Sequence, residues 1–161
     1  SGELRQTARS GASGGIKKYQ WTAIPLAIHG TVILADGTSV NIVIGEKDSD
    51  PVFYVNDLLP HLGADQMGKR ASEVITGEQL NVLVGSREFT DGEDEIKDAV
   101  KLNVMKWLNE NYGMKEADFL SAEIEVVPAF KARDIGFDRS LIGAYGHDDR
   151  VCLLVYSKRE R

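Results

Sequence analysis

The densest group of side chains that could take part in chemistry lies near the end of the sequence. Eight ionisable residues fall there within eighteen positions, interleaved with glycines: Arg133, Asp134, Asp138, Arg139, His147, Asp148, Asp149 and Arg150. The group follows a predicted strand, and a strand alone does not need so many charges. A solvated loop of balanced charge is the alternative interpretation, and composition alone does not favour either one.

Outside this group, residues that could act as metal ligands or nucleophiles are isolated in the sequence. His61 could bind a metal, but no second His or Cys stands at ligand spacing, so we expect a surface or helix-end position. Ser72, Ser86 and Ser140 match no nucleophile-elbow pattern, which gives no support to serine hydrolase chemistry. Cys152 is the single cysteine, so an intrachain disulfide is excluded, and we expect a small buried apolar residue.

Length and composition indicate one globular domain and argue against two kinds of partner. The chain has 161 residues, of which 42% are hydrophobic and 27% charged. A net charge of −6 and a pI of about 5.1 argue against binding to a phosphate backbone, so we expect no nucleic-acid partner. No apolar run approaches the roughly 20 residues of a membrane helix, and the N-terminus lacks a secretory signal core. With the single cysteine, this predicts a cytoplasmic protein without a membrane partner.

The clearest local signal is a β-hairpin within residues 30–44. Two runs rich in β-branched residues, 31–35 and 38–44, flank Asp36 and Gly37. Asp-Gly between such runs predicts a turn because glycine accepts a positive φ without steric cost. Alternate apolar residues of the second run, from Val40 onward, would share one face of the sheet.

The strongest helical pattern covers residues 91–112. Acidic residues 93–95 would lie in its first turn, where the helix dipole favours negative charge, and Gly113 would end it. Its apolar residues recur at helical spacing and form one stripe: Ile96, Val100, Val104, Trp107 and Leu108.

Shorter signals complete the expected elements. Residues 122–126 alternate between apolar and acidic side chains, which predicts a half-buried strand that Pro128 stops. A strand-like pattern within 16–28, an acidic loop at 46–50, a short helix at 57–62, a helix at 64–75 ending before Gly77, a strand at 80–84 and a turn at 115–119 are also expected. Without a regular βαβ rhythm, these elements predict an α+β fold, a β-rich sheet domain with a few packed helices.

Several separate segments together resemble one protein family. They are GGIKKYQW (14–21), IPLAIHG (24–30), DPVFYVNDLLPHL (50–62), residues 81–86, ARDIGFDRS (132–140) and GAYGHDDR (143–150). In this order they resemble the aspartyl aminopeptidase and aminopeptidase I family of dinuclear zinc exopeptidases. The resemblance runs from about Gly14 to Cys152, which is most of the chain.

The resemblance implies a part of a longer enzyme. In this family a dimerisation domain, β-rich with a few helices, is inserted into a catalytic domain. The chain resembles that insert: a flexible leader at 1–15, a dimerisation or assembly domain at 16–142, and the start of the returning catalytic domain at 143–161. The first zinc-binding His would lie upstream of Gly14, and the later ligands and catalytic Glu downstream of Cys152. We therefore expect a homo-oligomer, dimer or larger, that binds no zinc and is not active alone.

The resemblance also assigns roles to single residues. Asp148 would bridge the two zinc ions of the longer enzyme, because two neighbouring cations need a shared carboxylate. His29 would reach from one protomer into its neighbour's active site and hydrogen-bond the substrate carbonyl or oxyanion. The alternative is a His near a strand end bonded to a backbone carbonyl. Lys17 and Lys18 would contact a neighbouring subunit or an acidic substrate, or would be solvated surface residues.

Three functions remain open for the chain. The first is an assembly module of an aminopeptidase whose parent enzyme removes acidic or other N-terminal residues from peptides. The second is a component of an active metalloaminopeptidase that other chains complete. The third is a truncated reading frame without a function of its own. Arg133, Asp134, Asp138 and Arg139 are expected to form an ion-pair network that fixes the junction between domains, without a catalytic role.

Overall fold

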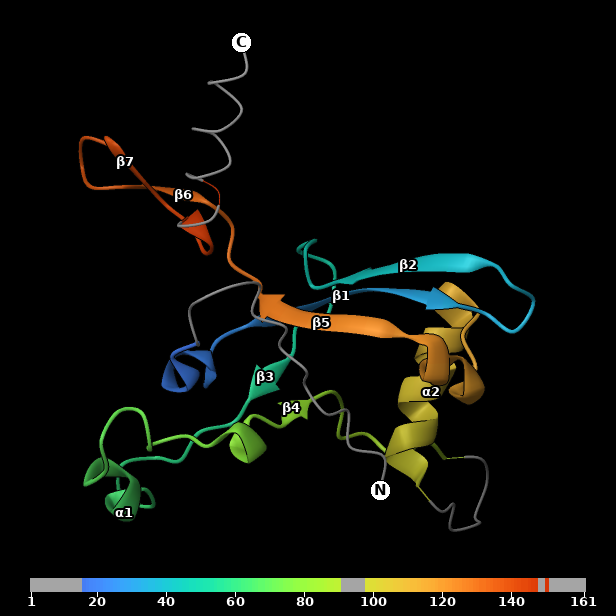
Figure 1. The fold of residues 1–161 in the computed structure, drawn as a ribbon, viewed down its shortest axis with the longest axis horizontal. Helices are drawn as coiled ribbons and strands as arrows, with labels where there is room; N and C mark the ends of the chain where they lie inside the picture. The colour runs from blue at the N-terminus through green and yellow to red at the C-terminus, as the bar shows by residue number, and fades with distance from the viewer. Residues whose placement is uncertain (1–15, 91–97, 148–149, 151–161) are drawn as a thin grey trace. The chain divides into compact units, whose positions relative to one another are not determined.

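The computed structural model describes residues 16–90, 98–147 and 150. The chain divides into two compact units, Ser1–Ala129 and Phe130–Arg161, and each is considered by itself. Strands and helices are mixed in the first unit, so the α+β prediction is confirmed (Figure 1). No helix among the described residues is long and apolar enough to span a membrane.

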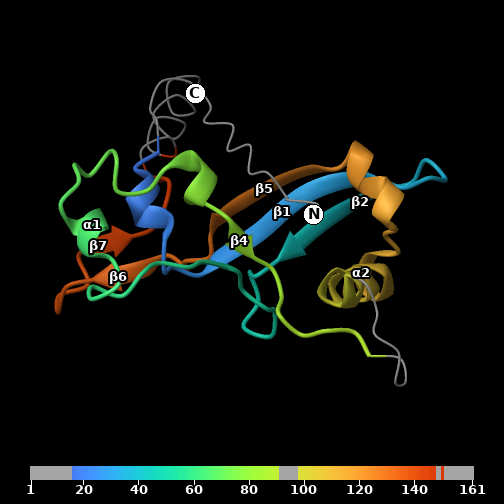
Figure 2. The same cartoon turned by 90° about the horizontal axis from the view of Figure 1, so that it is seen from below.

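The first unit is built around a three-stranded antiparallel sheet with the order β2-β1-β5. The strands are β1 (Leu26–Ile33), β2 (Ser39–Ile44) and β5 (Glu123–Pro128), and β1 is the central one (Figures 1 and 2). The register places Ile28 opposite Ile44 on β2 and opposite Val126 on β5. Glu123 and Glu125 are exposed while Ile124 and Val126 are half-buried, and β5 ends at Pro128, so both predictions for this strand are confirmed.

The predicted turn joins β1 to β2, although β1 ends at Ile33, two residues before the end of the predicted run. A hydrogen bond between Leu34 and Thr38 leaves three residues, 35–37, in the loop. The amide of Leu34 donates to the carbonyl of Thr38 at 2.8 Å, and Gly37 donates back to Leu34 at 2.9 Å. Gly37 has a φ of +85°, which closes the loop in the left-handed region. A tight turn followed by a left-handed glycine is the usual form of a three-residue hairpin loop.

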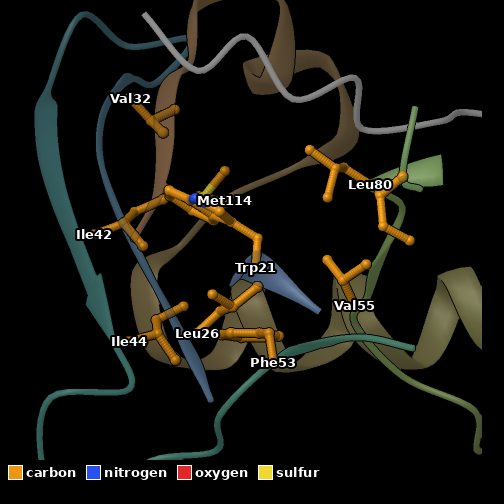
Figure 3. Packing of buried hydrophobic residues seen from close by; sticks show 10 residues of the cluster. Trp21, Leu26, Val32, Ile42, Ile44, Phe53, Val55, Leu80 and Met114 are labelled. Atoms are coloured by element: carbon orange, nitrogen blue, oxygen red, sulfur yellow. The ribbon is translucent and has the colours of Figure 1, made fainter. Parts of the chain in front are cut away.

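The core lies on one face of this sheet. Ile42 and Ile44 of β2 are buried there, as the sequence predicted, together with Leu26 and Val32 of β1. Figure 3 shows these side chains converging with Trp21, Phe53, Val55, Leu80 and Met114 from other segments. These other segments form a layer that packs against the sheet, and a two-stranded ribbon of β3 (Tyr54–Val55) and β4 (Val82–Leu83) is part of that layer.

The strand predicted within residues 16–28 is wrong for its first part. Residues Lys18–Trp21 form a 3-10 helix, η1, which buries Trp21 in the core. β1 begins only at Leu26, after Pro25, because proline has no N–H to donate to the ladder. The tertiary burial of the indole thus overrides the alternating pattern of the segment.

The helix predicted at 57–62 is wrong, and the helix predicted at 64–75 is confirmed only for its first turn. Residues 57–59 have no regular structure, and residues 60–62 form a turn. Asp57 accepts a hydrogen bond from the amide of its neighbour Leu58 (2.8 Å), and such a local side-chain bond competes with a helix. It also accepts one from the hydroxyl of Thr22 (3.1 Å) in a distant segment. Within residues 64–75, only α1 (Ala64–Met67) is helical. Gly77, which the prediction places after the helix, belongs to the 3-10 helix η2 (Gly77–Gln79).

The strongest predicted helix is confirmed at its C-terminal end. α2 spans Ala99–Tyr112 and ends at Gly113, which has a φ of +70° and donates to Asn109. Asp98 has a φ of +58°, so α2 begins after it, while residues 91–97 lie outside the described residues. A 3-10 helix, η3 (Glu116–Ser121), follows where a turn was expected and leads into β5.

Tyr112 connects the end of α2 to the sheet. Its hydroxyl donates to the backbone carbonyl of Val43 on β2 at 3.0 Å. α2 lies on the same side of the sheet as β3 and β4 (Figures 1 and 2), and residues of α2 and β4 line one cavity with the inner face of the sheet.

The second unit contains a short hairpin that the sequence did not predict. β6 (Arg133–Ile135) pairs with β7 (Leu141–Gly143) in antiparallel register. The sequence signal was hidden because charged residues dominate this stretch, and all three β6 side chains are exposed. The expected domain boundary after residue 142 stays a prediction.

Candidate functional site

His29 lies on the sheet face opposite the core. Its neighbours in β1 on either side belong to the buried face, so the imidazole projects from the other face. Its cross-strand partners there are Val43 on β2 and Glu125 on β5. The side chain is 38% exposed, so other molecules can reach it.

The imidazole of His29 pairs with a carboxylate. Its Nε2 lies 2.7 Å from Oε1 of Glu46, which follows the end of β2. The partner of Nε2 is therefore a side-chain carboxylate, and not the backbone carbonyl of the alternative prediction. Glu46 could not be predicted as a partner from the sequence, because the two residues are seventeen positions apart and only the β1–β2 register brings them together.

The loop that carries Glu46 has a defined shape. Asp50 accepts hydrogen bonds from the amides of Gly45 (3.2 Å) and Lys47 (3.1 Å), one on each side of Glu46. Gly45 has a φ of +105°, and a Cβ added there would lie 2.9 Å from Cα of Ala27. The residue must therefore be glycine, and the loop can pack closely against β1 only for that reason.

The Asp50 carboxylate makes the loop sensitive to acid. The backbone hydrogen bond from Lys47 is the main cause that holds the pKa of Asp50 below its ordinary value of 3.8. A group with a depressed pKa in the folded state stabilises that state above its ordinary pKa, and this contribution is lost as the pH falls through the lower value.

We expect Asp50→Asn to loosen this loop at neutral pH. The wild-type amide resonances of Gly45 and Lys47 should shift as the pH falls below 3.8, and Asp50→Asn should abolish that titration. NMR spectra recorded across this range measure both effects, with the distant Asp65→Asn as a matched control. An unchanged titration of the two amides in Asp50→Asn would contradict the assignment.

The two lysines predicted to contact a subunit or substrate lie at the start of η1. Lys17 is exposed, and its carbonyl accepts the amide of Gln20 at 2.9 Å. Lys18 is half-buried. The backbone amide of Glu78 and the hydroxyl of Thr76 hold the pKa of the Glu78 carboxyl below its ordinary value, and the positive charge of Lys18 adds a smaller effect in the same direction. Their role toward a partner stays a prediction.

The residues predicted to touch zinc are not brought together by the described part of the chain. Asp148 and Asp149 lie outside it, as does Cys152. His147 is exposed, and its Nε2 lies 3.0 Å from the carbonyl of Ile142. His61 is exposed in a turn, as expected. Within residues 16–90, 98–147 and 150, no three His, Cys, Asp or Glu side chains form a possible metal site.

Part of the predicted ion-pair network is present in the second unit. Arg139 Nε lies 2.9 Å from Oδ2 of Asp134, an ion pair within the β6–β7 hairpin. Asp138 instead accepts from Ser140, whose hydroxyl and amide lower the pKa of that carboxyl. These contacts close the hairpin turn, and a role in fixing a domain junction stays a prediction.

The core of the first unit is not fully closed. A cavity of about 440 Å³ lies between the inner face of the sheet, β4 and α2. Ile42, Val84, Val104, Trp107 and Met114 contribute to its mainly apolar lining. Every side chain of α2 keeps some exposure, and the apolar stripe predicted for this helix faces the cavity in part.

Comparisons with known proteins identify the family. The family model described as aminopeptidase I zinc metalloprotease (M18) matches residues 4–158, which extends beyond both ends of the resemblance. The probable M18 family aminopeptidase 1 of Clostridium acetobutylicum is 59% identical over 86% of this chain, and that of Thermotoga maritima is 56% identical over the same share. The match covers 30% of each relative, so the chain spans less than a third of their length.

Solved structures agree with the sequence comparisons. The crystal structure of an M18 family aminopeptidase from Thermotoga maritima aligns with a TM-score of 0.77 and 55% identity, covering 88% of this chain and 30% of that one. Aminopeptidase I from Clostridium acetobutylicum aligns with a TM-score of 0.73 and 58% identity, covering 87% and 30%. With one family model matching nearly its whole length, the chain belongs to the aminopeptidase I zinc metalloprotease (M18) family.

Proposed function

We propose that this chain is an assembly module of a zinc aminopeptidase, which self-associates into a dimer or larger homo-oligomer and is not active alone. The longer enzyme would remove N-terminal residues, acidic ones among them, from peptides in the cytoplasm. The names of the relatives support the reaction class, and the chain spans only about 30% of their length. The zinc ions and most of their ligands would therefore belong to the rest of that enzyme.

The open apolar cavity is the observation that carries the proposal. A single domain of this size normally closes its core, and an exposed apolar opening favours contact with another protein surface. Here the rim includes Val52, which is 45% exposed, and Trp107, which is 38% exposed. We assign this opening to a second copy of the chain, because a two-fold contact is self-complementary and would cover both openings at once.

The outer face of the sheet supports a second feature of the proposal. His29 is exposed there and is held by a neighbouring carboxylate, as a side chain that acts on another molecule needs to be. In the assembled enzyme it would hydrogen-bond a substrate in the active site of a neighbouring protomer. Lys17 and Lys18 would contact the neighbouring subunit or an acidic substrate.

The mass in solution tests the assembly directly. Light scattering at several protein concentrations should show a dimer or a larger closed assembly. Val52→Asp, which places a charge at the rim of the cavity, should weaken the association by at least about tenfold, equivalent to roughly 1.4 kcal/mol.

Leu120→Asp is the matched control, because Leu120 is 95% exposed and lies outside the cavity lining. It introduces the same charge in place of an exposed apolar residue and should leave the mass unchanged. A wild-type chain that stays monomeric at high concentration would refute the assembly module. Equal association of Val52→Asp and the wild type would refute the cavity as the contact.

A further inference from the structure

The contact between His29 and Glu46 determines which ring nitrogen carries a proton. Nε2 of His29 lies 2.7 Å from Oε1 of Glu46, within hydrogen-bond distance. An ionised carboxylate has no hydrogen to donate, so Nε2 must carry the proton and donate it. In the neutral ring, Nδ1 is then the unprotonated nitrogen.

We infer that Glu46 is a positioning residue for His29, which fixes the ring by Nε2 and leaves Nδ1 as the atom that meets a ligand. The inference rests on the proposed function, in which His29 acts on a molecule outside its own chain. A carboxylate that holds one nitrogen of a histidine while the other nitrogen works is a recurring arrangement in catalytic sites.

This arrangement restricts the chemistry of the ligand. In the neutral ring Nδ1 only accepts, so it suits an amide or ammonium N–H. In the protonated ring Nδ1 donates, and it then suits a carbonyl or carboxylate oxygen while Nε2 remains bonded to Glu46. A substrate carbonyl would therefore be bound by the imidazolium form of His29, with Glu46 balancing its charge.

The surrounding structure supports a positioning role for Glu46 in particular. Its loop is fixed on both sides by Asp50 and is packed against β1 at Gly45, so the carboxylate is presented to the ring by a constrained backbone. Glu125 is the other acidic residue on this face next to His29, as its cross-strand partner on β5. Replacing each carboxylate in turn therefore separates two effects: Glu46 lies within hydrogen-bond distance of the ring, whereas Glu125 is only its cross-strand neighbour.

NMR of the ¹⁵N-labelled chain tests the inference. Long-range ¹H–¹⁵N spectra, recorded at about pH 8 where imidazole is ordinarily neutral, report which ring nitrogen is protonated. The wild type and Glu125→Ala should show a single His29 tautomer, with the proton on Nε2. Glu46→Ala should allow both tautomers to exchange, so that the two nitrogen shifts move toward each other and the slowly exchanging Nε2–H signal is lost.

Glu46→Gln is the isosteric variant, because its amide keeps the size of the side chain but can donate to Nε2 as well as accept from it. It should also allow both tautomers, which the loss of side-chain volume in the alanine variant would not explain. A wild-type ring protonated on Nδ1, or a Glu46→Ala spectrum identical to the wild type, would overturn the inference. Backbone amide spectra confirm that each variant is folded.

The outcome is independent of the assembly test. If the chain proves monomeric and the tautomer still depends on Glu46, the positioning role stands and the proposed function fails. If the chain assembles and the tautomer does not depend on Glu46, the proposed function stands and the positioning role fails.

Discussion

Replacement of Leu26 by alanine is expected to lower the free energy of unfolding by about 2–5 kcal/mol, the usual cost of removing a fully buried leucine. Leu26 has no exposed surface and lies at the start of the central strand. It also exchanges two backbone hydrogen bonds of 2.9 Å with Phe53, so it joins the main sheet to the layer that contains β3. The cavity left by the substitution would therefore open at the junction of two layers.

Urea unfolding followed by tryptophan fluorescence measures this loss, since Trp21 belongs to the same core. Leu120→Ala is the control, because that side chain is 95% exposed and its removal should change the stability by less than about 0.5 kcal/mol. Equal midpoints for the two variants would show that Leu26 does not anchor the core.

Gly30→Ala should separate β5 from the central strand. A Cβ on Gly30 would lie 2.4 Å from the carbonyl oxygen of Glu123 and 3.1 Å from Cα of Ile124. Both atoms belong to the backbone of β5, so no side-chain rotation relieves the contact and the strand itself must move. We expect a loss of about 1–3 kcal/mol, typical of overpacking, and faster amide exchange throughout β5.

Gly68→Ala provides the comparison. A Cβ there would meet nothing within 4 Å, and its φ of −81° suits any residue. Its stability should stay within about 0.5 kcal/mol of the wild type, and exchange in β5 should not change. Protection of β5 that is equal in Gly30→Ala and the wild type would contradict the close approach of the two strands.

The elements that were predicted well depend on local sequence. The turn at Gly37 and the end of α2 at Gly113 both require a left-handed residue, and glycine marks such positions directly. The alternation in β2 and β5 likewise reflects a sheet with one buried face. Local chemistry was enough in each case, so the sequence predicted the turn between β1 and β2 and the strands β2 and β5, whereas β1 begins and ends earlier than the run predicted at 31–35.

The parts that were missed depend on contacts between distant segments. In place of the helix expected at 57–62 there is an irregular segment and a turn, and Asp57 there accepts a hydrogen bond from Thr22, thirty-five positions away. Trp21 was expected on a strand and instead folds into the core from a 3-10 helix. The partner of His29 was missed for the same reason, because Glu46 appeared in the sequence only as part of an acidic loop.

The hydrogen bond from Tyr112 to Val43 has a consequence for how copies of the chain can meet. β2 is an edge strand, and an unpaired edge is a template for strand addition and aggregation. The Tyr112 hydroxyl already occupies the carbonyl of Val43, so an incoming strand would have to displace it and move the end of α2. Growth of one continuous sheet across the β2 edge is thereby disfavoured, which would leave the faces of this unit as the surfaces for the proposed self-association.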